Sequence, residues 1–374
     1  MRAAGTVVHV IAPSPAGGAE SVVVALASAA RDTTQVVVLN QVADRDAPPH
    51  PMTAQLQRHG VTVEEIRCGR RRYGAEARAL EEHLRRVSAA LVHTHGYHGT
   101  VVAYFAAKDL GIPLVSTVHG YLTRSLKERV YNVIDRLLLR RFQAVIAVSH
   151  GIREQLLQSG LPPQRVHLVQ NGMAAHVADD RDRAREALGL DAADRVVGWI
   201  GRLSPEKGPD LFLRAYASSG ASGHAVIVGD GPEQPRLRDL AQTLGLDSQR
   251  VVFAGFRPNA AELLTAFDVL ALTSRMEGTP MVILEAVARG VPIVSFAIGG
   301  IPDLLNNDSA WLAPPENVDA IAESLRAALG QPDEARRRAT NARERLADRL
   351  SIESWVERIS KVYDAAVSSE GSPT

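Results

Sequence analysis

Short runs of β-branched and apolar residues alternate with amphipathic segments along most of this chain, and the alternation begins twice. Strands that alternate with helices form parallel sheets with helices on both faces. The pattern therefore predicts an α/β chain with two Rossmann-like, doubly wound domains. The strand-like runs of the first series are 7–12, 35–39, 61–66, 90–94, 113–118, 144–149 and 166–169, and those of the second are 196–200, 224–228, 251–254, 269–273 and 292–296.

The length of 374 residues fits about two domains of roughly 150 residues each. We expect an N-terminal Rossmann-like domain over residues 1–175 and a C-terminal Rossmann-like domain over 176–350. Residues 351–374 are expected to form a terminal helix with an apolar stripe, followed by a frayed tail. Open α/β sheets bind ligands beyond the carboxyl ends of their strands, so the two domains are expected to face a cleft.

Composition excludes several classes of function. The 42 basic and 42 acidic residues give a formal net charge of zero, which argues against a nucleic-acid partner. The single cysteine, Cys68, cannot form an internal disulfide and fits a reducing compartment. No apolar run approaches the ~18 residues needed to span a bilayer. We therefore expect a cytoplasmic protein without a transmembrane helix.

The densest group of chemically informative residues follows the first strand of the second series, in Gly201-Arg202-Leu203-Ser204-Pro205-Glu206-Lys207-Gly208. An arginine offers a forked pair of donors and a lysine a point charge. Arg202 and Lys207 are therefore suited to the charge that develops on a nucleoside-diphosphate leaving group. The alternative is an ordinary helix start with surface charges.

A second group follows the run 269–273, in Glu277-Gly278-Thr279-Pro280 and onward to Glu285. Pro280 suits the first turn of a helix, which places Glu277 in the loop before the helix and Glu285 on its second turn. Backbone amides near Gly278 and Thr279 would form an anion site at the helix N-terminus. A glutamate early in a helix is also what the helix dipole favours, so this spacing alone is weak support.

Taken together, these motifs resemble those of retaining family 4 glycosyltransferases (glycosyl transferases group 1) with the GT-B architecture. The resemblance covers nearly the whole chain and includes three further segments: 228–232 (Val-Gly-Asp-Gly-Pro), 299–303 (Gly-Gly-Ile-Pro-Asp) and 171–172 (Asn-Gly). It implies transfer of a sugar from a nucleotide-diphosphate sugar, with a UDP-sugar favoured, to a hydroxyl acceptor. Anomeric configuration would be retained, and neither a cofactor nor a metal ion would be needed.

The resemblance implies that the first domain (1–175) binds the acceptor, that the second (176–350) binds the nucleotide sugar, and that the terminal helix (351–374) crosses back to pack on the first domain. It also implies roles for individual residues. Arg202 and Lys207 would hold the donor diphosphate, Glu277 the transferred sugar and Glu285 the ribose hydroxyls. His119, at the end of the run 113–118, would contact the donor sugar and orient it. The implied catalytic residues are Arg202, Lys207, Glu277 and His119, and the implied donor-binding residues are Gly17, Gly18, Gly201, Arg202, Lys207, Gly278, Thr279, Pro280 and Glu285.

Three residues of the first domain are candidates for the acceptor side: His95 and Gly96, which follow a strand, and Asn171, which lies at the domain switch. A structural, hydrogen-bonded role is at least as compatible with His95. The acceptor implied by the resemblance is a glycan, a glycolipid or a small hydroxylated molecule.

Several alternatives remain open at this level. Zinc binding by His93, His95, His98 and His119 is disfavoured because no cysteine or carboxylate has suitable spacing. Metal-dependent transferases use an Asp-x-Asp motif, which occurs at 44–46 and 180–182, but the double-sheet pattern argues against their architecture. A nucleotide-sugar 2-epimerase-like isomerase, a non-catalytic carbohydrate-binding relative and a dinucleotide-dependent oxidoreductase are the other candidates. The last is weakened because Gln234 replaces the third glycine of its fingerprint.

The stretch 122–142 mixes arginine and lysine with leucine, valine, isoleucine and tyrosine. Such a segment can rest on an anionic membrane, so peripheral contact with the inner face of a membrane is one hypothesis. A first-domain helix with a solvated basic face is the simpler interpretation.

Overall fold

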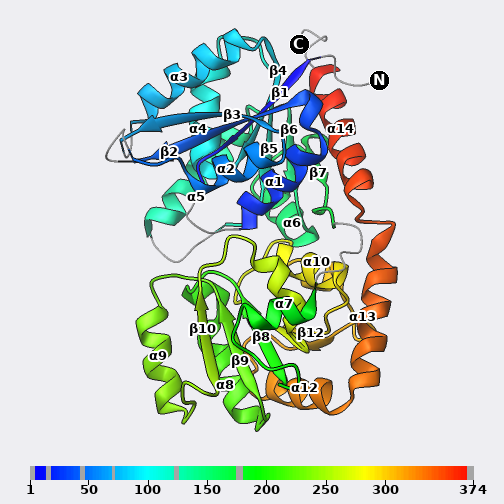
Figure 1. Cartoon of the computed structure of the whole chain (residues 1–374). Helices are drawn as coiled ribbons and strands as arrows, with labels where there is room; N and C mark the ends of the chain where they lie inside the picture. The colour runs from blue at the N-terminus through cyan, green and yellow to red at the C-terminus, as the bar shows by residue number, and fades with distance from the viewer. Residues whose placement is uncertain are drawn as a thin grey trace. The chain divides into compact units, whose positions relative to one another are not determined.

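The structure is a computed structural model that describes residues 5–13, 18–42, 47–69, 72–121, 126–173 and 180–368, without the side chains of residues 126 and 127. The chain divides into two compact units (Figure 1). Unit 1 comprises Met1–Asn171 and Ile352–Thr374, and unit 2 comprises Gly172–Ser351. The chain therefore leaves unit 1, forms unit 2 and returns.

Unit 1 is built on a parallel sheet of seven strands in the order β3-β2-β1-β4-β5-β6-β7. This order places β1 beside β4, which is the switch point of a doubly wound sheet. The strands are β1 (Thr6–Ile11), β2 (Thr34–Gln41), β3 (Thr62–Cys68), β4 (Ala89–His95), β5 (Leu114–Val118), β6 (Ala144–Ala147) and β7 (Val166–Leu168). The helices are α1 (Gly18–Ala29), η1 (Arg31–Thr33), α2 (Pro51–Arg58), α3 (Tyr73–Arg86), α4 (Gly96–Ala107), α5 (Leu126–Leu139), α6 (His150–Gln158), η2 (Pro163–Arg165) and α14 (Ile352–Ser368).

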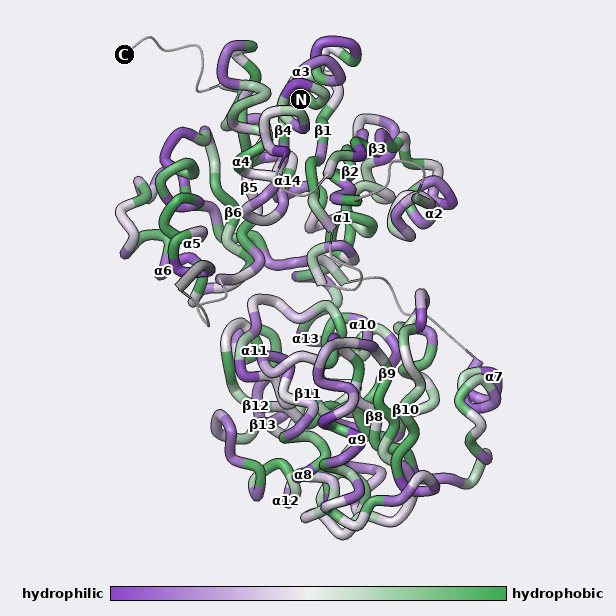
Figure 2. The backbone as a smooth tube through the Cα atoms, turned by 90° about the vertical axis from the view of Figure 1, so that its left-hand side faces the viewer, coloured by the Kyte–Doolittle hydropathy of each residue, from purple (hydrophilic) through white to green (hydrophobic). Residues whose placement is uncertain are grey.

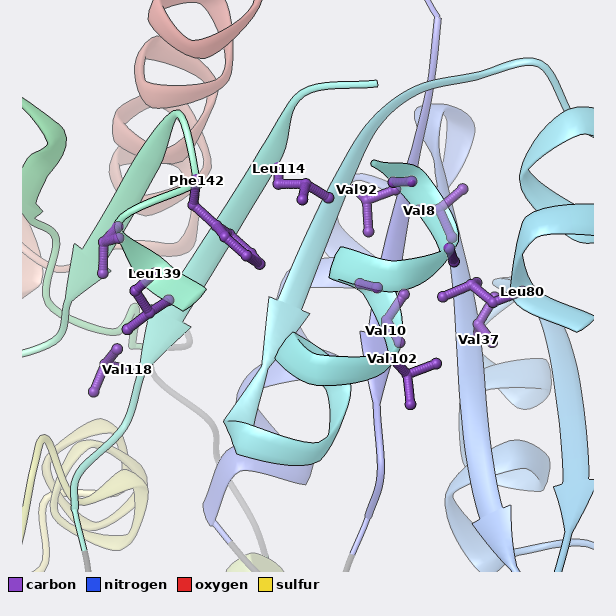
Figure 3. Close-up of a cluster of buried hydrophobic side chains, with 14 of the residues drawn as sticks. Val8, Val10, Val37, Leu80, Val92, Val102, Leu114, Val118, Leu139 and Phe142 are labelled. Atoms are coloured by element: carbon purple, nitrogen blue, oxygen red, sulfur yellow. The ribbon is translucent and has the colours of Figure 1, made fainter. Parts of the chain in front are cut away.

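The core of unit 1 lies between the sheet and its helices. Figure 3 shows valines of β1, β2 and β4 pointing toward Leu80 of α3 and Val102 of α4. Every residue of β5 is buried, because its strand has neighbours on both sides and helices on both faces. Local signals agree with these elements: Ser149 caps α6 by accepting a hydrogen bond from the Ile152 amide at 3.3 Å.

Unit 2 repeats this plan with six parallel strands in the order β10-β9-β8-β11-β12-β13. The tube in Figure 2 is largely apolar along β9 and β10. The strands are β8 (Val196–Ile200), β9 (His224–Val228), β10 (Val251–Gly255), β11 (Val269–Leu272), β12 (Ile293–Phe296) and β13 (Trp311–Ala313). The helices are α7 (Arg181–Glu186), η3 (Pro205–Lys207), α8 (Pro209–Ser219), α9 (Gln234–Thr243), η4 (Ala260–Ala266), α10 (Met281–Ala288), α11 (Ile301–Leu304), α12 (Val318–Gly330) and α13 (Pro332–Ala347).

The two parallel sheets confirm the predicted fold class. Strand β13 was not predicted, because three residues are too few to show a periodic pattern. Helix α14 belongs to unit 1, and its residues Trp355, Ile359 and Tyr363 are buried there. Among the described residues, no helix combines the length and apolar character needed to cross a bilayer.

Candidate functional site

The loop after β8 is fixed to its neighbours in the sheet by backbone hydrogen bonds. The Gly201 amide donates to the Val228 carbonyl at 3.0 Å, and the Leu203 amide donates to the Asp230 carbonyl at 2.9 Å. The loop then forms η3 and ends at Gly208, which has a left-handed backbone (φ 63°) and precedes α8. Arg202 and Lys207 are therefore presented from a loop with a defined shape.

Gly208 brings this loop into contact with the segment after β11. A Cβ atom at Gly208 would lie 2.0 Å from the Thr273 carbonyl oxygen. The Thr273 hydroxyl in turn donates to the Gly208 carbonyl at 2.8 Å. Only glycine allows both this φ and this close approach.

The same contact joins the two motifs that the sequence singled out. Lys207 Nζ lies 2.7 Å from Glu277 Oε1, and the Ser274 hydroxyl donates to that same oxygen at 2.7 Å. The Glu277 side chain is only 6% exposed, whereas that of Lys207 is 32% exposed. Glu277 Oε2 has no hydrogen-bond partner among the described residues. This atom is accessible to solvent, so a ligand hydroxyl can reach it.

Arg202 differs from the other arginine of this region. Arg202 is exposed and forms no ion pair or side-chain hydrogen bond within the described part of the chain. Arg275 instead holds Asp210 through two hydrogen bonds of 2.9 and 2.8 Å. Burial raises the pKa of Asp210, but the hydrogen bonds and charge of Arg275 outweigh burial and hold that pKa below its usual value. Arg275 therefore stiffens the site, and no sequence motif pointed to it.

The loop that carries Glu277 is also held from the side of β12. Gly299 has φ 53°, and a Cβ atom there would lie 2.0 Å from the Glu277 carbonyl oxygen. The Gly300 amide donates to the Gly278 carbonyl at 2.9 Å. These contacts place Gly278 and the buried Thr279 immediately before α10.

Helix α10 begins at Met281 with Pro280 as its N-cap, and no side chain caps it. Uncapped amides at a helix N-terminus attract anions. Glu285 lies on the second turn and is half-buried. Burial raises the pKa of its carboxyl, and the nearby positive charge of Arg289 opposes the rise.

In unit 1, two predicted site residues lie together. His95 ends β4, and its Nδ1 lies 3.2 Å from Nε2 of His119, which follows β5. Gly96, with φ 79°, begins α4 directly after His95. Burial lowers the pKa of His119 to about 4, so its ring is neutral near pH 7.

The sequence missed three side chains beside these histidines: His9 of β1, Thr117 of β5 and Tyr363 of α14. His9 Nδ1 lies 3.0 Å from His95 Nε2, and Tyr363 contacts His93 at 2.7 Å. A lone histidine within an apolar strand gives no signal by itself, and the contact with Tyr363 spans 270 positions.

His9, His93 and His95 are also close enough to suggest a metal, since one ligand atom from each lies within 4.8 Å of the others. Sequence reasoning considered His93, His95, His98 and His119 for this role and omitted His9. His98 instead pairs with the buried Glu76 at 2.8 Å.

The remaining predicted residues are placed as follows. Gly17 lies outside the described residues, and Gly18 is the first residue of α1. Asn171 is buried at the end of the first segment of unit 1. Of the two Asp-x-Asp sequences, 44–46 lies outside the described residues. In the other, Asp180 caps α7, and Arg181 pairs with Asp268 at 2.6 Å, so this tripeptide has a structural role.

Both halves of the chain match known glycosyltransferase families. Residues 16–176 match "Glycosyltransferase Family 4", and residues 180–345 match "Glycosyl transferases group 1". The chain is 31% identical over 305 residues to the 2-deoxystreptamine N-acetyl-D-glucosaminyltransferase of Streptomyces fradiae, covering 74% of this chain and 71% of that protein. It is 29% identical over 310 residues to the alpha-D-kanosaminyltransferase of Streptomyces kanamyceticus, covering 75% and 78%.

Solved structures share the fold over nearly the full length. A structure of Anabaena Alr3699/HepE in complex with UDP-glucose has a TM-score of 0.84 at 24% identity, covering 96% of this chain and 99% of that one. The sucrose-phosphate synthase of Thermosynechococcus elongatus has a TM-score of 0.81 at 21% identity, covering 98% and 100%.

Proposed function

The chain belongs to family 4 of the glycosyltransferases, and from this premise we propose that it transfers a sugar from a UDP-sugar to a hydroxyl of a small acceptor without a metal ion. The family itself establishes a glycosyltransferase that uses a nucleotide sugar and retains anomeric configuration. Membership of this family argues against the three alternatives left open by the sequence: an isomerase, an oxidoreductase and a non-catalytic carbohydrate-binding relative.

The observation that carries the proposal is the junction of the loops after β8 and β11. Lys207 contacts Glu277 there, and the exposed Arg202 lies on the same loop as Lys207 without an ion-pair partner among the described residues. We assign Arg202 and Lys207 to the donor diphosphate, because fixed cations stabilise charge that develops on a leaving group. In this proposal Gly201 and the segment Gly278-Thr279-Pro280, which leads into the N-terminus of α10, border the same phosphates.

Two glutamates complete the donor site in this proposal. Glu277 Oε2, which is open to a ligand, accepts a hydrogen bond from a hydroxyl of the transferred sugar, and Glu285 accepts hydrogen bonds from the ribose hydroxyls. We also assign His119 to contact with the sugar and Gly18 to backbone contact with the donor or acceptor; Gly17, assigned the same role, lies outside the described residues. Catalysis is then electrostatic and positional: the acceptor hydroxyl and the departing phosphate lie on one face of the sugar, and the phosphate accepts the proton.

Relatives and fold neighbours support the choice of substrates. Structures with the same fold contain UDP or UDP-glucose, which favours a UDP-sugar over a GDP-sugar. The names of the relatives specify 2-deoxystreptamine, L-malate and D-inositol 3-phosphate, all of them small hydroxylated molecules. We therefore favour such an acceptor over a glycan or glycolipid, with His95, Gly96 and Asn171 on the acceptor side.

A surface on α5 supports peripheral membrane contact as a second element of the proposal. Val130, Val133, Ile134 and Leu137 are exposed at helical spacing on α5. The exposed arginines in and beyond this helix are Arg129, Arg140 and Arg141. An apolar stripe with nearby basic residues suits an anionic lipid surface. Residues 122–125, the start of the predicted basic stretch, lie outside the described residues.

Thermal unfolding with UDP, GDP, dTDP and NAD tests the donor assignment. A ligand specific for the folded state adds about 2.7 kcal/mol of stability at a hundred times its dissociation constant. UDP is expected to stabilise the wild type and to lose this effect in Arg202→Ala/Lys207→Ala. Arg326→Ala, an exposed arginine on α12 in the same unit, is the matched control and should keep it. Equal UDP stabilisation in the double variant would contradict the proposal.

A further inference from the structure

Six side chains form one continuous hydrogen-bond chain inside unit 1. They come from three neighbouring strands, from the residue after β5 and from α14, so segments far apart in sequence contribute. In order along the chain, the residues are Thr117, His93, Tyr363, His9, His95 and His119.

The buried end of the chain lies at Thr117. Thr117 Oγ1 is 2.7 Å from His93 Nε2, and His93 Nδ1 is 2.7 Å from the Tyr363 hydroxyl. The Tyr363 hydroxyl is 3.5 Å from His9 Nε2. Both nitrogens of His93 are thus occupied.

The other end of the chain lies at His119, the residue that the proposed function assigns to the donor sugar. His9 Nδ1 is 3.0 Å from His95 Nε2, and His95 Nδ1 is 3.2 Å from His119 Nε2. His119 is half-buried, and its Nδ1 has no hydrogen-bond partner within the described part of the chain. The Nδ1 atom of His119 is accessible to solvent, so a ligand can contact it.

Each ring in the chain is neutral. Burial lowers the pKa of His9 to about 3 and lowers the pKa values of His93 and His95 well below the usual value. Burial likewise raises the pKa of the Tyr363 hydroxyl, which stays protonated. A neutral imidazole has one N–H and one acceptor nitrogen, so each ring must donate on one side and accept on the other. The Tyr363 hydroxyl carries one proton, and accepting from both rings would bury that proton without an acceptor, so Tyr363 also donates on one side and accepts on the other. All hydrogen bonds in the chain therefore run in the same direction.

Thr117 selects that direction. Its hydroxyl is buried, and His93 is its only hydrogen-bond partner among the described residues. If His93 donated to Thr117, the threonine proton would be buried without an acceptor, which is energetically unfavourable. Thr117 therefore donates to His93. His93 then donates to Tyr363, Tyr363 to His9, His9 to His95, and His95 Nδ1 to His119 Nε2.

We propose that this chain fixes His119 as the tautomer with its proton on Nδ1, so that His119 presents an N–H donor to an oxygen of the donor sugar. The contact with sugar rests on the proposed function, whereas the tautomer does not. Thr117, His93, Tyr363, His9 and His95 act as positioning residues. The C-terminal helix α14 thereby sets the state of a ring at the end of β5.

A metal bound by His9, His93 and His95 is the competing explanation of this cluster. A metal would have to displace the 2.7 Å contacts of His93 with Tyr363 and Thr117 or the 3.0 Å contact between His9 and His95. The hydrogen-bond chain uses all these contacts as they stand, so the geometry favours it.

Nitrogen NMR of the full-length protein labelled with ¹⁵N-histidine tests the tautomer directly, because protonated and unprotonated ring nitrogens resonate separately. His119→Asn identifies the His119 signals. We expect a single Nδ1–H tautomer in the wild type and a mixture in Tyr363→Phe, which removes the link between His93 and His9. Tyr216→Phe removes a comparable buried hydroxyl, bonded to the Gly223 carbonyl at 2.7 Å in unit 2, and should leave His119 unchanged.

Thr117→Val is a second variant at the other end of the chain and is also expected to give a mixture, so the test does not depend on one protein folding. An Nε2–H tautomer in the wild type, or a His119 tautomer unaffected in every folded variant, would overturn the proposal. So would stoichiometric perturbation of the His9, His93 and His95 signals by added Zn²⁺, which would establish the metal site instead.

Kinetics separate this proposal from the function on which it rests. If both hold, Tyr363→Phe lowers kcat/KM for sugar transfer roughly two- to tenfold, the equivalent of one weakened hydrogen bond. Tyr216→Phe should not, and His119→Asn, which keeps an N–H donor, should retain more activity than His119→Ala. A tautomer that shifts in Tyr363→Phe while His119→Ala transfers sugar normally would keep the chain and refute the role of His119.

Discussion

The ammonium group of Lys207 lies 2.7 Å from Glu277 Oε1, although 70 positions separate the two residues in the sequence. Lys207 lies in the loop after β8 and Glu277 in the loop after β11, and these strands are neighbours in the sheet. The pair places a cation beside the carboxylate that we propose binds the transferred sugar. It also gives Glu277, which is almost fully buried, its counter-charge.

This pair is expected to be energetically coupled. Lys207→Met leaves a buried carboxylate without its counter-charge and should lower the free energy of unfolding by about 1–3 kcal/mol. The same substitution in a Glu277→Gln background should cost less, by about 1–2 kcal/mol. Urea denaturation of the four proteins measures the difference. The exposed pair Lys361–Glu357, also 2.7 Å apart, is the control and should show no measurable coupling. Additive effects of Lys207 and Glu277 would contradict the expectation.

We predict that Gly208 cannot be replaced by alanine without loss of stability. The reason is the close contact with Thr273, in addition to the left-handed backbone. Gly208→Ala should lower the free energy of unfolding by at least about 2 kcal/mol more than Gly245→Ala. The control has nearly the same backbone angle (φ 71° against 63°) but no atom within 4 Å of its added Cβ. Equal urea midpoints for the two variants would show that the contact with Thr273 can relax freely. Loss of UDP stabilisation in Gly208→Ala alone would link the contact to the donor site.

Stability is predicted to fall with pH below about 6.5, the ordinary pKa of histidine. The folded state of His9 has a pKa of about 3, so it binds fewer protons than the unfolded state in this range, and acid favours unfolding. His9 alone should cost about 2 kcal/mol between pH 6.5 and 5. His93, His95 and His119 act in the same direction.

Two acids, the buried Asp135 and the half-buried Glu285, oppose this trend, because burial raises the pKa of each carboxyl. Burial raises the pKa of Asp135 to about 6, so its folded state binds more protons than the unfolded state and gains stability as the pH falls through that value. These two carboxyls stand against the four imidazoles of His9, His93, His95 and His119, so a net loss of stability remains. Urea denaturation at pH 7.5, 6.5, 5.5 and 5 measures the free energy of unfolding. A free energy that does not change with pH would contradict the conclusion that the buried histidines are neutral.

The exposed stripe of α5 is predicted to bind anionic vesicles. Burying one valine side chain in the interface is worth roughly 1.5 kcal/mol, so Val133→Ser should weaken binding about tenfold in cosedimentation. Val367→Ser is the matched control, since Val367 is an exposed valine on α14 of the same unit. Binding should also weaken at high salt, because the arginines beside the stripe contribute. Identical sedimentation of both variants and the wild type would refute a membrane role for α5.

The sequence by itself determined most of the helices and strands and the loops that carry the candidate site residues. Alternation of apolar runs and amphipathic segments, repeated twice, predicted two parallel sheets, because strands buried on both faces must be apolar along their length. The spacing of Pro280 and Glu285 placed the start of α10 to within one residue, since Pro280 is the N-cap and the helix begins at Met281, and it correctly placed Glu285 on the second turn. Helical spacing of Trp355, Ile359 and Tyr363 predicted the buried stripe of α14. Each of these depends on interactions between residues close in sequence.

Only the tertiary structure decided which side chains meet. The periodicity of apolar residues does not specify the order of the strands in a sheet. That order brings Lys207 to Glu277 and His9 to His95. The partner of His93 is Tyr363, whose helical stripe predicted burial and nothing about a hydroxyl contact. The short strand β13 likewise forms by pairing with β12. These features depend on contacts between distant segments, whose free energy is gained only when the whole sheet is assembled.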